Sequence, residues 1–274
     1  MWSFRDHRKG LCISLAFLLL LGCMGAIAAL VTALWPEASG DVCYVVGAFS
    51  VDASHADQGY FMARREACDT ALKMRVTKGD TVYTYDLNNE GEYEVFPLQM
   101  GSGTYTCSLY AHVRDGKYKK DAEISFIVEM EDEDTAYLYP SQYVYYTEDS
   151  PAVQASEEIC EGLETDEEKI AAIIAYMRDN YAYDYTRAAV GPGFYLGDVD
   201  GCFEDQIGLC QDLSAVAACM LRVQGIPTQM VIGYADRQYH AWNSVLIDGE
   251  YQRLDMTAEI TGVPASVYTP ERRY

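Results

Sequence analysis

Basic residues are scarce in this chain. Lysine and arginine number 20 against 42 aspartates and glutamates, so the 274 residues carry a formal net charge of −22. A chain this acidic is repelled by the phosphate backbone of nucleic acids and by anionic lipid headgroups. The composition therefore excludes nucleic acid as a partner and excludes docking on a membrane through charge. It is typical of a soluble domain that faces the outside of a cell.

Histidine is also scarce, with four in the chain. Three of them, His7, His55 and His112, belong to no recognisable group of reactive side chains. His240 differs, because Cys210 and Asp255 flank it within one short region. A thiol, an imidazole and a carboxylate are the parts of an activated cysteine nucleophile. The alternative for His240 is an ordinary core or surface histidine.

The residues after Cys210 predict a helix that begins at this thiol. Gly225 and Pro227 end a pattern of apolar side chains three and four positions apart. The pattern consists of Leu213, Val216, Ala217, Met220 and Leu221. Free N–H groups at a helix N-terminus favour a thiolate and can bind an oxyanion. The alternative for Cys210 is simple packing, and Asp212 is interpreted as a first-turn charge that complements the helix dipole.

Residues 240–255 predict a β-hairpin. As a strand, residues 240–247 would place His240, Trp242, Ser244 and Leu246 on one face, and Asp248-Gly249 is a strong two-residue turn signal. This turn would place Asp255 diagonally across from His240 on the same face, with Cα atoms about 7–8 Å apart. Asp255 could then accept a hydrogen bond from the imidazole and stabilise its charged form. A slip of one residue would move Asp255 to the other face.

These segments resemble the transglutaminase-like superfamily of papain-related bacterial thiol enzymes. The resemblance spans residues 166–255 and implies a triad without a cofactor or metal ion. In that triad Cys210 is the nucleophile, His240 the base and Asp255 the acid that orients it. The ordered motifs are Gly-x-Cys-x-Asp (208–212), Gly-Ile-Pro (225–227), Gly-Tyr (233–234), His-Ala-Trp (240–242) and Asp-x-Thr (255–257).

One departure from the superfamily concerns the oxyanion. Members that crosslink proteins use a tryptophan upstream of the nucleophile to bind it, but this chain has none between Trp35 and Trp242. The sequence leaves three side chains as candidates to replace this tryptophan as the oxyanion donor, namely Gln206, Gln211 and Tyr195. We therefore expect hydrolysis rather than crosslinking, with peptide, protein or peptidoglycan amides as substrates. The alternative is a non-catalytic cell-surface binding or adhesion protein that retains the fold.

The N-terminus predicts a membrane anchor. Arg5, Arg8 and Lys9 precede an apolar run from Leu11 to Trp35, which is long enough to span a bilayer. The positive charges would stay in the cytoplasm, so the remainder would be extracellular. Because the apolar run continues past Cys23, we favour an uncleaved single-pass signal-anchor over a lipoprotein attached at Cys23.

The rest of the chain predicts an α+β protein. We expect a tail and anchor over 1–36, a small β-sandwich over 41–130, a linker over 131–164, and a catalytic domain of helices on an antiparallel sheet over 165–274. The sandwich resembles the immunoglobulin-like domain that precedes transglutaminase-like domains in some clostridial surface proteins. Its expected strands are 71–76, 81–85, 104–110 and 124–128.

Local signals add four expectations. Seven cysteines lie outside the anchor, and Cys68 and Cys107 are the candidate disulfide among them. Because seven is an odd number, pairing of the others would leave one free thiol, which would fit Cys210. The acidic run 129–134 lacks the spacing of a calcium loop and is interpreted as a solvated linker. Tyrosines in 137–146 are expected to pack at the domain junction, with sugar stacking as the alternative. Thr165 begins a helix that backs the catalytic one, and 191–197 forms a loop that borders the site.

Overall fold

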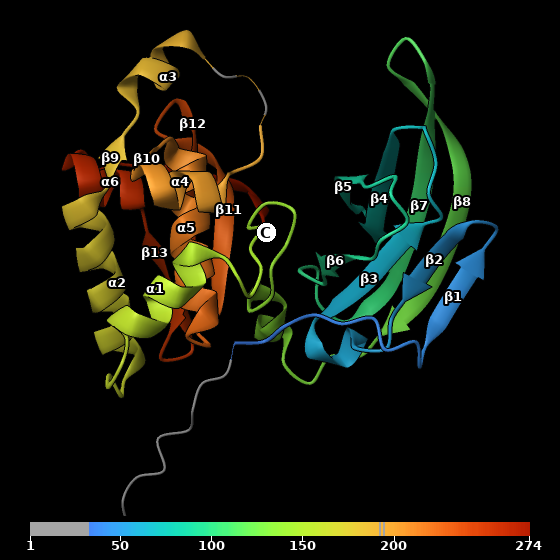
Figure 1. The fold of residues 1–274 in the computed structure, drawn as a ribbon, viewed down its shortest axis with the longest axis horizontal. Coiled ribbons are helices and arrows are strands. Elements are labelled where there is room, and N and C mark those ends of the chain that lie inside the picture. The colour runs from blue at the N-terminus through green and yellow to red at the C-terminus, as the bar shows by residue number, and fades with distance from the viewer. Residues whose placement is uncertain (1–32, 192, 194) are drawn as a thin grey trace, which may run out of the picture. The chain divides into compact units, whose positions relative to one another are not determined.

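A computed structural model of the chain describes residues 33–191, 193 and 195–274 (Figure 1). The predicted anchor over 1–36 and the alternative lipid site at Cys23 therefore fall largely outside the described residues. None of the helices in the described part of the chain is long and apolar enough to cross a membrane. Membrane attachment stays a prediction from the sequence.

The described chain contains short 3₁₀ turns, six α-helices and fourteen strands. The 3₁₀ turns are η1 (Ala56–Gln58) and η2 (Glu133–Tyr137). The helices are α1 (Pro151–Ile159), α2 (Asp166–Asn180), α3 (Tyr185–Val190), α4 (Val199–Asp205), α5 (Cys210–Val223) and α6 (Met256–Thr261). The strands are β1 (Cys43–Val46), β2 (Phe49–Asp52), β3 (Tyr60–Arg65), β4 (Leu72–Lys78), β5 (Thr81–Leu87), β6 (Glu94–Pro97), β7 (Gly103–Arg114), β8 (Lys117–Val128), β9 (Ala182–Tyr183), β10 (Ile207–Gly208), β11 (Thr228–Ala235), β12 (Gln238–Ile247), β13 (Glu250–Leu254) and β14 (Tyr268–Arg273).

The N-terminal strands form two antiparallel sheets of four strands, ordered β1-β2-β3-β6 and β5-β4-β7-β8. All four strands expected from the sequence lie in the second sheet, where buried and exposed side chains alternate. The first sheet was missed, because its strands are short and β3 buries four consecutive side chains, which removes the alternation. The turn at Asp115-Gly116 has positive φ at both residues, as a two-residue hairpin requires.

The two sheets lie face to face (Figure 1), and aromatic side chains join them into one core. Phe61 of β3 meets Phe126 of β8 edge to face, with ring centroids 5.4 Å apart. Phe96 of β6 meets Tyr85 of β5 in the same manner at 5.1 Å. Two facing antiparallel sheets agree with the expected sandwich. The immunoglobulin-like relationship stays a prediction.

The predicted disulfide between Cys68 and Cys107 is wrong. All seven cysteines among the described residues are free. Cys107 lies on β7 with no exposed surface, and burial raises the pKa of its thiol. Cys68 lies in the loop before β4, where its thiol donates to the Thr70 carbonyl. The two thiols belong to different environments that strand alternation alone does not reveal.

The C-terminal part packs helices on a third antiparallel sheet, ordered β13-β12-β11-β14. Helix α5 contacts β11 and β12 on one side and α1, α2, α4 and α6 on the others (Figure 1). The capping box between Thr165 and Glu168 begins α2 as predicted, and α2 packs against α5. The mixed α+β class is confirmed, with a buried central helix that carries the predicted nucleophile at its first residue.

The segment between these parts is anchored by its side chains. Tyr139, Tyr143 and Tyr146 are buried, which confirms the packing interpretation of the tyrosine-rich stretch. The acidic run before it is not simply solvated, because Asp134 accepts a hydrogen bond from the Tyr251 hydroxyl at 2.7 Å. In the part of the chain that the structure describes, no group of three or more His, Cys, Asp or Glu could hold a metal ion.

Candidate active site

Cys210 is the first residue of α5, so the predicted position of the thiol at a helix N-terminus is confirmed. Almost every later side chain of this helix is buried, which fixes the helix in the centre of the domain. The helix ends at Val223, and Gly225 follows with a φ of +76°. Cys210 itself is partly exposed and lines a cavity. The fold therefore holds the thiol rigidly while leaving it accessible.

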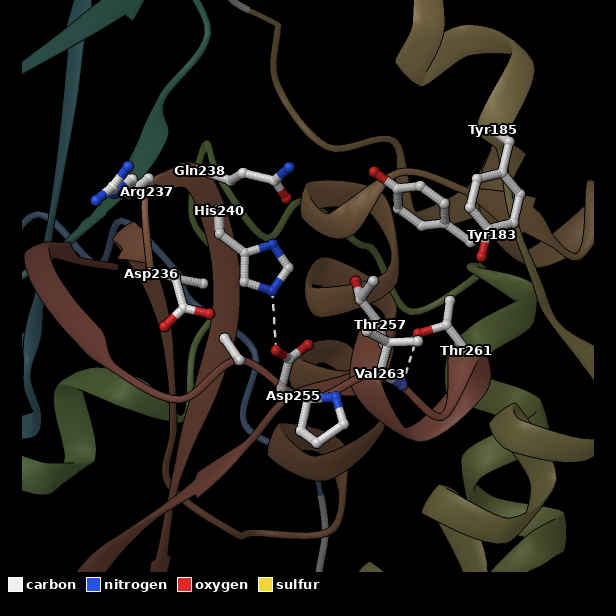
Figure 2. Close-up of a pocket in the computed structure, with 13 residues that line it drawn as sticks. Tyr183, Tyr185, Asp236, Arg237, Gln238, His240, Asp255, Thr257, Thr261 and Val263 are labelled. Atoms are coloured by element: carbon white, nitrogen blue, oxygen red, sulfur yellow. Dashed lines mark hydrogen bonds and ion pairs between the residues drawn. The ribbon is translucent and has the colours of Figure 1, made fainter.

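The hairpin of β12 and β13 brings His240 to Asp255. Ile247 pairs with Glu250 across the Asp248-Gly249 turn, which confirms the predicted register. The Nε2 atom of His240 lies 2.9 Å from Oδ2 of Asp255 (Figure 2). This bond leaves Nδ1 as the ring nitrogen available to another group.

Asp255 is held by two further hydrogen bonds. Its Oδ1 atom accepts from the backbone N–H of Ala258 at 3.1 Å and so caps α6. Its Oδ2 atom accepts from the Tyr268 hydroxyl at 2.7 Å. Sequence reasoning missed Tyr268, because this residue arrives on β14, which joins the sheet by pairing with β11. No spacing of residues in the sequence identifies Tyr268 as a partner of Asp255.

Trp242 and Tyr268 cover the histidine. The Trp242 ring lies nearly parallel to the imidazole of His240, with centroids 6.2 Å apart. Tyr268 meets the Trp242 ring edge to face at 5.2 Å. Trp242 is only 4% exposed, so it is a core residue that keeps water from the His240–Asp255 pair.

The electrostatics of the pair follow from its neighbours. Burial by itself would lower the pKa of His240, but hydrogen bonds to Asp255 and Cys210 outweigh it and raise that pKa to about 9. Burial would raise the pKa of Asp255, but the bond to His240 and its charge hold it below the usual range. The imidazole is therefore positively charged and the carboxylate negatively charged at neutral pH.

Asp212 does more than complement the dipole of α5. Its side chain is 1% exposed, and Oδ2 accepts from Arg187 Nη1 at 2.8 Å and from the backbone N–H of Leu209 at 3.0 Å. The Tyr195 hydroxyl contacts the same oxygen at 3.4 Å. A Cβ atom at Gly208 would lie 2.8 Å from Asp212 Cβ, which explains the glycine in this motif. Asp212 therefore ties α3 and the following loop to the start of α5.

The residues of the predicted triad line two cavities. One, of about 610 Å³, is lined by His240, Asp255, Tyr183 and the segment from Thr261 to Ala265 (Figure 2). The other, of about 270 Å³, contains Cys210. Its wall includes Gly193 and Tyr195, so the predicted loop over 191–197 does border the site, although Pro192 and Phe194 lie outside the described residues. Tyr183 lines both cavities.

Comparisons with known proteins give one family match and several similar solved structures. Residues 153–256 match the family model described as the transglutaminase-like superfamily. Among solved structures, the chain is similar to a candidate cysteine protease from Cytophaga hutchinsonii, with 13% identity over 78% of this chain and 91% of that chain and a TM-score of 0.39.

Two other solved structures are also similar. The periplasmic domain of TgpA from Pseudomonas aeruginosa is 15% identical over 83% of this chain and 77% of that chain, with a TM-score of 0.37. A transglutaminase from red sea bream is 16% identical over 74% of this chain and 48% of that chain, with a TM-score of 0.30. A search of curated proteins found no match.

Proposed function

We propose that this chain, whose residues 153–256 belong to the transglutaminase-like superfamily, is a cysteine-dependent enzyme that acts on amide bonds. Cys210 is its nucleophile, His240 its general acid and base, and Asp255 the group that orients His240. One observation carries the proposal, namely the 2.9 Å contact between the His240 imidazole and the Asp255 carboxylate, which leaves Nδ1 of His240 for the Cys210 thiol at the first residue of α5.

The proposed mechanism follows from these positions. Cys210 and His240 form a thiolate–imidazolium pair in which the proton of the thiol already lies on His240, and the thiolate attacks the carbonyl carbon of the amide. When the tetrahedral intermediate collapses, the C–N bond breaks and the His240 imidazolium gives its proton to the leaving amine. Water, activated by neutral His240, then attacks the thioester and releases the acid. The Asp255 carboxylate stabilises the imidazolium throughout.

The substrates we propose are peptide, protein or peptidoglycan amides. The cavity at Cys210 supports an uncharged group next to the reacting carbonyl, because five tyrosines line it and none of its described lining residues is Asp, Glu, Lys or Arg. Hydrolysis rather than crosslinking follows from the missing upstream tryptophan. The acidic composition supports the absence of nucleic acid among the partners.

The location we propose is the outer face of a cell membrane. This proposal rests on the sequence, where basic residues precede the apolar run from Leu11 to Trp35. A signal-anchor would keep the enzyme tethered and expose its cavities to the outside. Lipid attachment at Cys23 would give the same orientation.

The test is the pH dependence of iodoacetamide labelling at Cys210 in the full chain, followed by peptide mass spectrometry. We expect rapid labelling near pH 6 that is lost in His240→Ala, because the imidazolium stabilises the thiolate. Cys43 is exposed and free, and because partial burial and the nearby Asp52 carboxylate raise the pKa of its thiol, it serves as an unactivated reference in the same digest. Slow labelling of Cys210 that rises with pH in parallel with Cys43, unchanged in His240→Ala, would exclude the enzyme and leave the binding protein.

A further inference from the structure

The proposed reaction needs donors for the oxyanion. When the thiolate attacks, the carbonyl oxygen becomes negatively charged, and preorganised hydrogen-bond donors stabilise it. The backbone N–H of Cys210 is one such donor, because the first N–H groups of a helix have no partner within the helix. A second donor must come from a side chain that faces the thiol.

The three candidates that the sequence leaves for the second oxyanion donor are poorly placed to donate to the oxyanion. Gln206 is exposed at the end of α4. Gln211 donates its amide N–H to the Tyr195 carbonyl at 2.7 Å. The Tyr195 hydroxyl contacts Asp212, a buried carboxylate that competes with any other acceptor. A donor already committed to an anion cannot turn to a substrate without breaking that bond.

Tyr183 is placed where these three are not. It lies on β9, which pairs in parallel with β10 so that Tyr183 is opposite Gly208, just before the nucleophile. The N–H of Asp184 donates to the Gly208 carbonyl at 3.0 Å and reinforces this pairing. Tyr183 lines the cavity of Cys210 and also the cavity of His240.

The Tyr183 hydroxyl is free to act. It points across the cavity toward His240 (Figure 2), and it has no hydrogen-bond partner among residues 33–191, 193 and 195–274. Burial and the nearby charge of Cys210 raise the pKa of this phenol above its ordinary value. The hydroxyl therefore keeps its proton across the working pH range and remains a donor.

We propose that the Tyr183 hydroxyl is the second oxyanion donor, together with the backbone N–H of Cys210. The inference rests on the proposed function. The sulfur electron pair forms the C–S bond, and the electrons of the C=O π bond move to oxygen, which accepts both hydrogen bonds. No proton leaves Tyr183. On collapse the C=O bond forms again, the C–N bond breaks, and the amine takes its proton from His240.

The test compares two reactions of Cys210 in the full chain. Iodoacetamide alkylates the thiolate by displacing iodide and forms no oxyanion. p-Nitrophenyl acetate acylates the same thiolate through a tetrahedral oxyanion and releases p-nitrophenolate, which is measured by absorbance. Cys210→Ala gives the background of both reactions. The variant is Tyr183→Phe, and the matched control is Tyr234→Phe on β11, which lines neither cavity.

We expect Tyr183→Phe to slow acylation about 100- to 1,000-fold, the effect of removing one oxyanion donor. Alkylation should stay within about twofold of the wild type, because the thiolate and its pairing with His240 are untouched. Wild-type acylation rates in Tyr183→Phe would overturn the inference. Equal losses in both reactions would also overturn it, since Tyr183 would then only position Cys210. A wild-type Cys210 that resists iodoacetamide would instead overturn the proposed function.

Discussion

His240 shows how neighbours override burial at the scale of a single residue. An imidazole removed from water favours its neutral form, yet the Asp255 carboxylate and the Cys210 thiol raise the pKa of His240 to about 9. The hydroxyl of Tyr268 and the N–H of Ala258 in turn fix that carboxylate. The imidazole is therefore both oriented and charged before a substrate arrives.

Asp255→Asn tests this arrangement. We expect acylation of Cys210 to fall about 100- to 10,000-fold, because the amide neither fixes the tautomer nor stabilises the imidazolium. In the wild type, turnover of an amide should decline as pH rises through about 9, where His240 loses the proton that the amine needs. The carboxylate raises the pKa of His240, so the variant should show this decline at lower pH.

The matched control for this change is Asp248→Asn. Asp248 lies in the turn of the same hairpin with a φ of +51°, a conformation that asparagine adopts readily. The pH profile of amide turnover by the Asp248→Asn variant should coincide with that of the wild type. An unchanged rate in Asp255→Asn, or an unmoved alkaline decline, would contradict the assigned role of the carboxylate.

At the scale of elements, Asp212 connects the start of α5 to α3 and to the loop before α4. Arg187 of α3 donates to this buried carboxylate, and its guanidinium also lies 4.5 Å from the centre of the Tyr195 ring. The N–H of Asp198 contacts the other oxygen at 3.3 Å. These bonds hold one wall of the cavity that contains Cys210.

Asp212→Asn should therefore weaken both the fold and the cavity wall. We expect the free energy of unfolding to drop by about 2–4 kcal/mol. The neutral amide of asparagine removes the negative charge that pairs with Arg187, and it leaves one of the buried donors around this side chain without an acceptor. Urea unfolding measures this loss, and limited proteolysis within 191–197 should become faster. Asp205→Asn, at the exposed end of α4, is the control. Equal stability of Asp212→Asn and Asp205→Asn would refute the structural role of Asp212.

At the scale of the whole molecule, one buried arginine joins segments far apart in the sequence. Arg222, near the end of α5, is 1% exposed. Its guanidinium donates to the backbone oxygens of Tyr139 at 2.7 Å, Thr228 at 2.7 Å and Tyr274 at 2.8 Å. All of these acceptors are backbone oxygens, and no Asp or Glu side chain among the described residues pairs with the guanidinium. The tyrosine-rich segment, the sheet and the C-terminal strand thus share one anchor.

Arg222→Met tests this anchor. The side chain keeps much of its volume but leaves three backbone oxygens without this donor, so we expect the free energy of unfolding to fall by about 2–4 kcal/mol. Chemical denaturation monitored by tyrosine and tryptophan fluorescence measures the change. Arg178→Met, at an exposed position on α2, should be nearly neutral. A fully stable Arg222→Met would show that these hydrogen bonds contribute nothing net.

Short-range patterns were enough to predict several parts of this protein. The helix that begins at Cys210, the capping box at Thr165 and the register across Asp248-Gly249 depend on neighbours within one element or one hairpin. Such interactions are local, so residue spacing determines them. The pairing of His240 with Asp255 follows from this register.

Tertiary structure alone decided the remaining parts of the site. Tyr268 reaches Asp255 only because β14 pairs with β11, where Gly233 leaves room for the backbone of the crossing strand. Arg187 reaches Asp212 across a loop, and Tyr183 reaches the nucleophile through the pairing of β9 with β10. The prediction of a disulfide between Cys68 and Cys107 was wrong for the same reason, because the sequence does not show which distant segments lie together. Contacts between distant segments depend on how whole elements pack, and the apolar periodicity of an element shows that it has a buried face but not which element covers that face.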